Sequence, residues 1–199
     1  MGKDVFELLD GGVWIYGSAN DLPEVYALLR RTADICFEMN ALPPSESGRR
    51  EKILRGLLGS VGKCIVVNPP FRCDFGHNIH IGDNFIGNFN LTILDEAKVS
   101  IGDNVMIGPN CTLATIIHAM LPAQRNAGIM RAKPISIGNN VCLASNVTVL
   151  PGVTIGDNAV IGAGSVVTKS IPAFTFAAGN PCRPIRPITD ADAVTPVNR

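Results

Sequence analysis

The stretch Ile137-Gly-Asn-Asn-Val-Cys-Leu-Ala-Ser-Asn-Val-Thr-Val-Leu-Pro-Gly-Val-Thr154 repeats a pattern of six residues, and the pattern continues through Ile155-Gly-Asp-Asn-Ala-Val-Ile-Gly-Ala-Gly-Ser-Val-Val-Thr168. A β-branched residue or leucine opens every unit, and a small or medium-sized residue follows four positions later. Neither an α-helix nor an ordinary strand has this period. A period of six is typical of a parallel β-helix, in which each unit supplies one short strand and one turn, and three units complete a coil.

The units predict a stack of buried side chains, because three successive units return the chain to the same face of a triangular prism. Ile137 is then expected to lie beneath Ile155, and Leu143 beneath Ile161. Burial of each such side chain contributes roughly 1.5–3 kcal/mol, so the stack is expected to be the main source of stability. Gly, Asn and Asp follow the apolar position because tight corners need residues that tolerate unusual backbone angles.

Upstream of this stretch, two gaps between apolar positions are longer than the repeat requires. The apolar positions 81 and 101 are separated by slightly more than the three units of a coil, so a corner over residues 95–98 is expected to bulge. Positions 113 and 137 are separated by a whole unit more than a coil, which predicts a loop over residues 118–134 that leaves the prism. Such loops often carry function.

The N-terminal segment has a helical pattern. A helix is predicted over residues 21–39, where Pro23 occupies the first turn and Pro43-Pro44 ends the segment. A second helix is predicted from Ser45 or Ser47 to residues 59–62. The predicted organisation is a helical segment over 1–62, an all-β solenoid over 63–187 that contains the extruded loop, and a tail over 188–199.

Composition narrows the function. The 199 residues are 46% hydrophobic, and 17 Lys and Arg balance 17 Asp and Glu, so no nucleic-acid partner is indicated and any cation for a phosphorylated ligand must be local. The N-terminus lacks a secretion signal, and the uncharged residues 134–156 repeat with a period of six rather than forming a membrane span. The cysteines form no C-x-x-C pair and are predicted to be reduced, which favours the cytoplasm. They are Cys36, Cys64, Cys73, Cys111, Cys142 and Cys182.

The chain resembles the hexapeptide-repeat acyltransferases, and most closely the galactoside and maltose O-acetyltransferases. Besides the hexads, the residues that carry the resemblance are Asn78-Ile-His-Ile-Gly82, Asn88-Phe-Asn-Leu-Thr-Ile93, Val99-Ser-Ile-Gly-Asp-Asn-Val105, Pro109-Asn110 with His118, and Ala177-Ala-Gly-Asn-Pro-Cys-Arg183. The resemblance implies a left-handed parallel β-helix, a homotrimer and transfer of an acetyl group from acetyl-CoA to a hydroxyl, with no metal.

The resemblance assigns the catalytic role to His118, which follows Pro109-Asn-Cys-Thr-Leu113 as the family's catalytic histidine does. Acetyl transfer needs a base because a free alcohol is a poor nucleophile at neutral pH, and an imidazole suits this task. A single histidine at a strand end, taken without the resemblance, is more often structural.

The resemblance also implies acceptor contacts from Asp74, Asn88, Asp95 and Glu96, since carboxylates and amides accept hydrogen bonds from sugar hydroxyls. For Asp95 and Glu96, turn chemistry is an equally good explanation. Three positions depart from the galactoside-type pattern and leave the specific sugar open: Gly17 replaces an acidic residue, Ile86 a tyrosine and Cys142 a tryptophan.

The family binds coenzyme A between neighbouring subunits. By resemblance, the main-chain N–H of Ser145 faces the thioester as an oxyanion-hole candidate, and the small residues Gly108 and Ala163 let a pantetheine arm approach. The residues that correspond to the adenine and phosphate end are Thr168, Lys169, Arg183 and Arg186.

Other functions stay open from the sequence. Some solenoids of this shape are zinc carbonic anhydrases with three histidines, and this chain has His77, His80 and His118. A separation of three points His77 and His80 to opposite faces of a strand, which disfavours that function. A non-catalytic binding solenoid is a further class. Within acyl transfer, an amino sugar, an antibiotic or a polysaccharide could replace the simple sugar acceptor.

Overall fold

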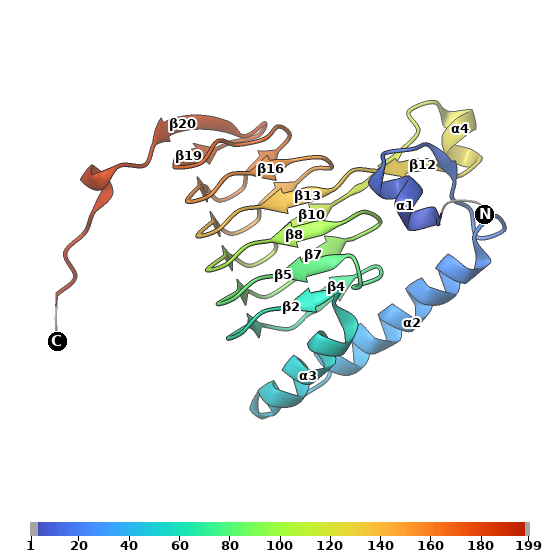
Figure 1. Cartoon of the computed structure of the whole chain (residues 1–199), viewed down its shortest axis with the longest axis horizontal. Coiled ribbons are helices and arrows are strands. Elements are labelled where there is room, and N and C mark those ends of the chain that lie inside the picture. The colour runs from blue at the N-terminus through green and yellow to red at the C-terminus, as the bar shows by residue number, and fades with distance from the viewer. Residues whose placement is uncertain (1–3, 198–199) are drawn as a thin grey trace.

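The protein is a parallel β-solenoid in this computed structural model, which describes residues 4–197 (Figure 1). The predicted all-β solenoid is therefore confirmed, while residues 1–3 of the N-terminal segment and 198–199 of the tail lie outside the described range. Three parallel sheets form the faces of the prism. The first face contains β2 (Ser60–Val61), β5 (Ile79–Ile81), β8 (Val99–Ile101), β13 (Ile135–Ile137) and β16 (Thr154–Ile155).

The second and third faces follow the first in each coil, and their inward side chains complete one continuous core. The second face contains β3 (Val66–Val67), β6 (Ile86–Gly87), β9 (Met106–Ile107), β14 (Cys142–Leu143), β17 (Val160–Ile161) and β19 (Thr175–Ala178), with β20 (Arg183–Pro187) antiparallel at its edge. The third face contains β4 (Phe71–Cys73), β7 (Leu91–Leu94), β10 (Thr112–Ala114), β15 (Thr148–Val149) and β18 (Val166–Val167).

The register of the strands explains the irregular spacing of the first coils. Ile81 pairs with Ile101 in the early coils, whereas Ile137 pairs with Ile155 in the later and more regular ones. The early coil is therefore the longer by two positions. The extra positions lie where the chain passes from the third face to the first, over 95–98 as predicted and also over 74–78. We call this corner of the prism the long edge, since all the extra residues of the coils are placed there.

The corners between the first and second faces are held by a ladder of polar side chains. Asn84, Asn104, Asn140 and Asn158 all have positive φ, and each amide donates to the next along the stack at 3.0–3.1 Å. The Oδ1 atoms of Asp103 and Asn139 accept a backbone N–H from the neighbouring coil at 2.7 and 2.8 Å. The Gly-Asp/Asn-Asn sequence therefore meets two requirements. Its last Asn adopts the positive φ of the corner, and its Asp and Asn side chains make the hydrogen bonds between coils.

Helices cover the first coil. α2 (Pro23–Asn40) and α3 (Ser47–Leu57) confirm the two predicted helices, and they are joined through η1 (Pro44–Glu46). α2 buries Thr32, Cys36 and Met39 against the coil. A short α1 (Val5–Asp10), which the sequence did not predict, packs beside the long edge (Figure 1).

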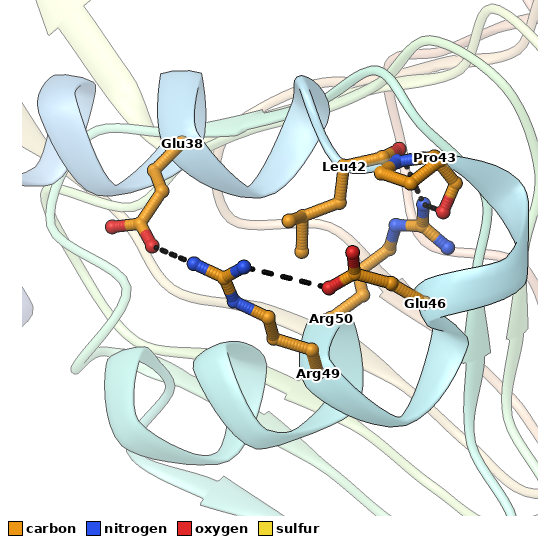
Figure 2. A network of polar contacts seen from close by, with 6 residues as sticks. All are labelled: Glu38, Leu42, Pro43, Glu46, Arg49 and Arg50. Atoms are coloured by element: carbon orange, nitrogen blue, oxygen red, sulfur yellow. Dashed lines mark hydrogen bonds and ion pairs between the residues drawn. The ribbon is translucent and has the colours of Figure 1, made fainter.

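The turn between α2 and α3 is held by two arginines (Figure 2). Arg49 lies between Glu38 and Glu46, at 3.0 and 3.4 Å from their carboxylates. Arg50 is buried and donates to the carbonyls of Leu42 and Pro43, at 3.1 and 3.4 Å. Since Arg50 satisfies carbonyls at the end of α2, the connection itself is a structured element rather than a loose linker.

The extruded segment is an ordered hairpin rather than a bare loop. β11 (Ile116–His118) and β12 (Ile129–Ala132) are antiparallel and flank α4 (Pro122–Asn126), and β1 (Ile15–Tyr16) from the N-terminal segment joins the other side of β12. We call residues 115–134 the hairpin. It leaves the prism at the long edge, so the largest insertion occupies the same corner as the smaller excesses.

All six cysteines are free thiols, as predicted, but they are not all buried. Cys64 is exposed at a corner with positive φ, and Cys142 is only half-buried. Within residues 4–197, no helix combines the length and the apolar character that crossing a membrane requires. The C-terminal part ends with a short 3₁₀ helix, η2 (Asp190–Asp192).

The ladder predicts a difference between two substitutions of Asn104, whose φ is 56°. Asn104→Ala should lower the free energy of unfolding by about 1–2 kcal/mol, because alanine disfavours this backbone angle and also loses the ladder hydrogen bonds. Asn104→Gly loses only the hydrogen bonds and should be about 1 kcal/mol more stable than the alanine variant. Urea unfolding measures both, and equal losses would contradict the role of the backbone angle.

Candidate active site

His118 ends β11 and pairs with Met130 of β12, so the hairpin positions it beside the long edge. Its side chain is exposed and has no protein hydrogen-bond partner among the residues that the structure describes. An exposed imidazole on an ordered strand is available to a substrate proton. The structure therefore places the predicted base on a rigid element at the surface.

Asp74, Asp95 and Glu96 lie together on the long edge. Asp95 is completely buried, and its Oδ1 accepts the backbone N–H groups of Asp74 and Phe75 at 3.1 and 2.9 Å. Asn78 donates to the Asp95 carbonyl at 2.6 Å. Asp95 therefore shapes the bulged corner, which is the turn chemistry that the sequence left open, and it does not reach the surface where an acceptor could touch it.

Asp74 and Glu96 are half-buried, and their carboxyl groups interact closely enough that each shifts the titration of the other. Burial and the charge of Asp74 raise the pKa of Glu96 to about 8, and burial also raises the pKa of Asp74. Burial raises the pKa of Asp95 to about 6. The pair therefore retains a proton to a higher pH than isolated carboxyls do, and the two groups titrate together.

Thr115, at the root of the hairpin, connects these carboxyls to the strand that carries His118. Its buried hydroxyl donates to the Leu94 carbonyl at 2.8 Å, accepts from the Ala97 amide at 3.0 Å, and lies 3.4 Å from Oε2 of Glu96. Thr115 is not among the site residues predicted from the sequence. A polar residue directly before an extruded segment was the available signal, because a chain that leaves a solenoid must satisfy its backbone groups at that point.

The remaining predicted residues of the core site lie on another corner, between the second and third faces. Asn88, Gly108, Ser145 and Ala163 follow the second-face strands of four coils. Asn88 is half-buried, and its Oδ1 accepts the Phe89 amide at 2.9 Å. In residues 4–197 the Ser145 amide donates no hydrogen bond to protein, so it is available to an oxygen of a ligand. We call this corner the donor edge.

Gly108 has a structural explanation within the coil stack. A Cβ at this position would lie 2.8 Å from the Ala144 carbonyl carbon and 2.9 Å from the Ser145 nitrogen. Real Cβ contacts are longer, so only glycine allows the two coils to approach here. The packing of the coils therefore requires glycine at position 108 whether or not a ligand lies against the donor edge. Ala163 is exposed on the same edge.

The residues predicted to bind the adenine and phosphate end of the donor all lie on the surface near the C-terminal coil. Thr168 and Lys169 follow β18, and Arg183 and Arg186 belong to β20. Arg186 forms an ion pair with Asp192 at 2.6 Å and its guanidinium lies 5.8 Å from the Phe176 ring. A phosphate at this position would therefore compete with Asp192 for the guanidinium.

The outward side chains distinguish the second face from the other two. On the second face they form an apolar row in register: Val66, Ile86, Met106, Cys142, Val160 and Phe176. The corresponding row of the first face is Ser60, His80, Ser100, Ser136 and Thr154. Val66 and Met106 are 50% exposed. A contiguous apolar row on a solenoid face is typical of a surface that another protein chain covers.

The three departures from the galactoside-type pattern fall in two places. Ile86 and Cys142 belong to the apolar row, and Gly17 lies beside the hairpin. A Cβ on Gly17 would lie 2.5–2.8 Å from the side chain of Met130. An acidic side chain at position 17 would therefore need the Met130 side chain to move, because the two side chains would otherwise overlap.

The three histidines do not come together. His77 packs edge-on against Phe6, with ring centroids 4.7 Å apart, and Nδ1 of His80 lies 3.0 Å from the Ser60 hydroxyl. No group of three potential metal ligands is found in the described part of the chain. His80 therefore has a structural contact on the first face.

Comparison with known proteins identifies the family. Residues 134–169 match the bacterial transferase hexapeptide (six repeats), residues 18–62 the maltose acetyltransferase hexapeptide capping motif, and residues 98–117 the hexapeptide repeat of succinyl-transferase. A galactoside O-acetyltransferase of Escherichia coli (strain K12) is 51% identical over 192 residues, which is 96% of this chain and 93% of that protein. The chain belongs to the hexapeptide-repeat acetyltransferases.

Solved structures of this family have the same fold over nearly the whole chain. A maltose O-acetyltransferase from Clostridium difficile 630 superposes with a TM-score of 0.89 at 44% identity, covering 94% of this chain and 99% of that one. A galactoside acetyltransferase in complex with coenzyme A gives a TM-score of 0.89 at 46% identity, covering 96% and 94%. The likeness includes the capping helices as well as the coils, so this acetyltransferase has the complete architecture of its relatives.

The shifted carboxyl groups predict a pH dependence of stability. A carboxyl whose pKa is raised on folding stabilises the protein fully below its unfolded value, near 4.5 for Glu96, and this stabilisation is lost as pH rises through about 8. The free energy of unfolding should therefore fall between pH 5 and 8, at up to about 1.4 kcal/mol per pH unit for one proton. Glu96→Gln should flatten this slope.

Urea unfolding at pH 5, 6, 7 and 8 measures the effect. The control is Glu24→Gln, which removes an exposed carboxyl in the first turn of α2. The control should keep the slope of the wild type. A slope that is the same in all three proteins would show that Glu96 titrates normally in the folded state.

Proposed function

We propose that the chain is an acetyl-CoA-dependent O-acetyltransferase that transfers an acetyl group to a hydroxyl of a sugar or glycoside. The observation that carries this proposal is the likeness to galactoside and maltose O-acetyltransferases over more than nine tenths of the chain. The coenzyme A in one of those structures supports the same donor here. The free thiols, among them Cys36 and Cys73 with sulfurs 4.0 Å apart, fit a reducing compartment such as the cytoplasm.

In this proposal His118 is the general base of a direct transfer. The acceptor hydroxyl attacks the thioester carbonyl while its proton passes to the imidazole, and the Ser145 amide stabilises the negative oxygen that forms. When the carbon–sulfur bond breaks, the imidazolium returns the proton to the coenzyme A sulfur. The exposure of His118 and the unpartnered amide of Ser145 within residues 4–197 support these roles.

Asp74, Glu96 and Asn88 would hold the acceptor. The Asp74–Glu96 pair offers carboxyl oxygens that accept hydrogen bonds from sugar hydroxyls, and because the pair retains a proton it carries less negative charge than two ionised carboxylates. Asp95 would position Asp74 through its backbone amide rather than touch the acceptor.

The donor edge would hold the pantetheine arm along Gly108, Ser145 and Ala163. The adenine and phosphate end would then lie near the last coils, where the cationic and hydroxyl side chains are exposed. These are Thr168, Lys169, Arg183 and Arg186.

The separation of the two edges supports a homotrimer. Within one chain the third face lies between the long edge, which carries His118, and the donor edge, which carries Ser145. A neighbouring copy could bring its hairpin to the donor edge and complete the site. The apolar row of the second face supports the contact, since the corresponding row of the first face is polar.

The first test is acetyl-CoA turnover with a panel of sugars and glycosides. His118→Ala should lower kcat by roughly 10²–10⁴ because the attacking hydroxyl loses its base. Release of the coenzyme A thiol measures turnover, and circular dichroism confirms that the variant keeps the solenoid. His80→Ala is the matched control, because His80 faces outward from a coil and contacts Ser60. Turnover that His118→Ala leaves unchanged would exclude the histidine as base.

The second test concerns the assembly. Met106→Glu places a charge in the apolar row and should convert the trimer into monomers that have lost most of their turnover. Ser100→Glu adds the same charge to the first face of the same coil and should leave the trimer intact. Sedimentation analysis measures the mass, and a wild-type monomer with full turnover would contradict the shared site.

A further inference from the structure

The outer side of the hairpin contains a cleft that the proposed reaction does not use. The cleft has a volume of about 510 Å³ and lies between α4, the hairpin strands and the segment before β1. Its walls are mostly apolar, and Trp14, Met120 and Leu121 are 45%, 91% and 63% exposed. Apolar side chains gathered at such exposure around a hollow are typical of a binding surface.

One cation lines this apolar cleft. The guanidinium carbon of Arg131 lies 4.5 Å from the centre of the Trp14 ring, in a cation–π contact. The Nε of Arg131 is buried without a hydrogen-bond partner, and within residues 4–197 its guanidinium forms no ion pair. The nearby Arg125 is different, since it donates to the carbonyls of Ala119 and Met120 at 3.3 and 2.9 Å. Arg131 is therefore held in place by Trp14 while its donors stay unused.

The charge around Arg131 is unbalanced. The hairpin contains Arg125, Arg131 and Lys133 but no Asp or Glu, although the whole chain has zero net charge. No carboxylate lines the cleft among the residues that the structure describes. A half-buried guanidinium without a counter-charge attracts an anion, and its planar fork matches a carboxylate or a phosphate.

The cleft adjoins the proposed reaction site, but Arg131 and His118 lie on different faces of the hairpin. Side chains alternate along a strand, and Arg131 pairs with Ile117 whereas His118 pairs with Met130. The side chains of Arg131 and Ile117 therefore leave the hairpin on one face, and those of His118 and Met130 on the other. His118, the strand neighbour of Ile117, also lines the cleft.

We propose that this cleft is a second binding site, for a small amphipathic anion. Its carboxylate or phosphate pairs with the Arg131 guanidinium, and its apolar part lies against Trp14, Ile117 and Leu121. The site goes beyond the proposed acetyl transfer, because the residues that recognise the anion are Arg131, Trp14, Ile117 and Leu121; His118, which also lines the cleft, is the one residue that the two sites have in common.

Trp14 is the only tryptophan in the chain, so its fluorescence reports directly on the cleft. Titration with hexanoate and with hexyl phosphate should change the emission saturably, and comparison of the two distinguishes a carboxylate from a phosphate ligand. Hexanol, which has the apolar chain but no charge, should bind at least about tenfold more weakly. Acetate and inorganic phosphate, which lack the apolar part, should also bind weakly.

Two variants test the role of the guanidinium. Arg131→Gln should weaken binding of the anions about tenfold or more. The affinity of Arg131→Lys should lie between those of the wild type and Arg131→Gln, because lysine keeps the charge without the planar fork. Lys133→Gln is the matched control: it removes a charge from the same hairpin but does not line the cleft, so it should bind like the wild type.

The outcomes that overturn the proposal are specific. No saturable change with either anion would exclude the site. If hexanol binds as tightly as hexanoate, or if the anions bind Arg131→Gln as tightly as the wild type, the cleft is hydrophobic and does not recognise an anion. Emission that responds to dilution of the protein rather than to the anions would assign the cleft to a contact between copies. Each of these results is independent of whether the protein transfers acetyl groups.

Discussion

The structure depends on one constraint, which is that every coil must return to the register of the coil beneath it. The buried columns and the Asn ladder both require this return, because each inward side chain and each corner amide meets its equivalent one coil away. The corners between the first and second faces cannot grow without breaking the ladder. Extra residues are therefore confined to the long edge, where they form the bulges at 74–78 and 95–98 and the hairpin at 115–134.

This confinement explains why chemically active groups gather at one corner. A bulge exposes backbone groups that a regular turn satisfies, and buried Asp95 accepts two of those amides. The same bulge brings Asp74 and Glu96 together at half-buried positions, where they share a proton. The hairpin starts one coil above, and Thr115 connects it to Glu96. The carboxyls and the hairpin that carries His118 therefore lie at the long edge because the extra residues are there, while the free Ser145 amide lies on the regular donor edge.

The sequence predicted the features that repeat, and it failed where contacts join distant segments. A period of six is a local pattern, so the coils, the bulge at 95–98 and the extruded segment could all be predicted from spacing. The hairpin is completed by β1, whose Ile15 pairs with the distant Met130, and no local pattern indicates that pairing. The stacking of Arg131 on Trp14 depends on the same pairing. The sequence also left Asp95 open between a ligand role and a turn role, and only the fold shows that its carboxylate is buried inside the corner, which favours the turn role.

The shared proton of Asp74 and Glu96 has a further consequence for how a neutral acceptor would be recognised. Two neighbouring ionised carboxylates would repel each other, and each could only accept hydrogen bonds. Burial and the charge of Asp74 raise the pKa of Glu96 to about 8, so the pair carries less negative charge at pH 7 than two ionised carboxylates. The burial that makes these carboxyls costly for stability at high pH is thus the property that suits them to an uncharged, hydroxyl-rich ligand.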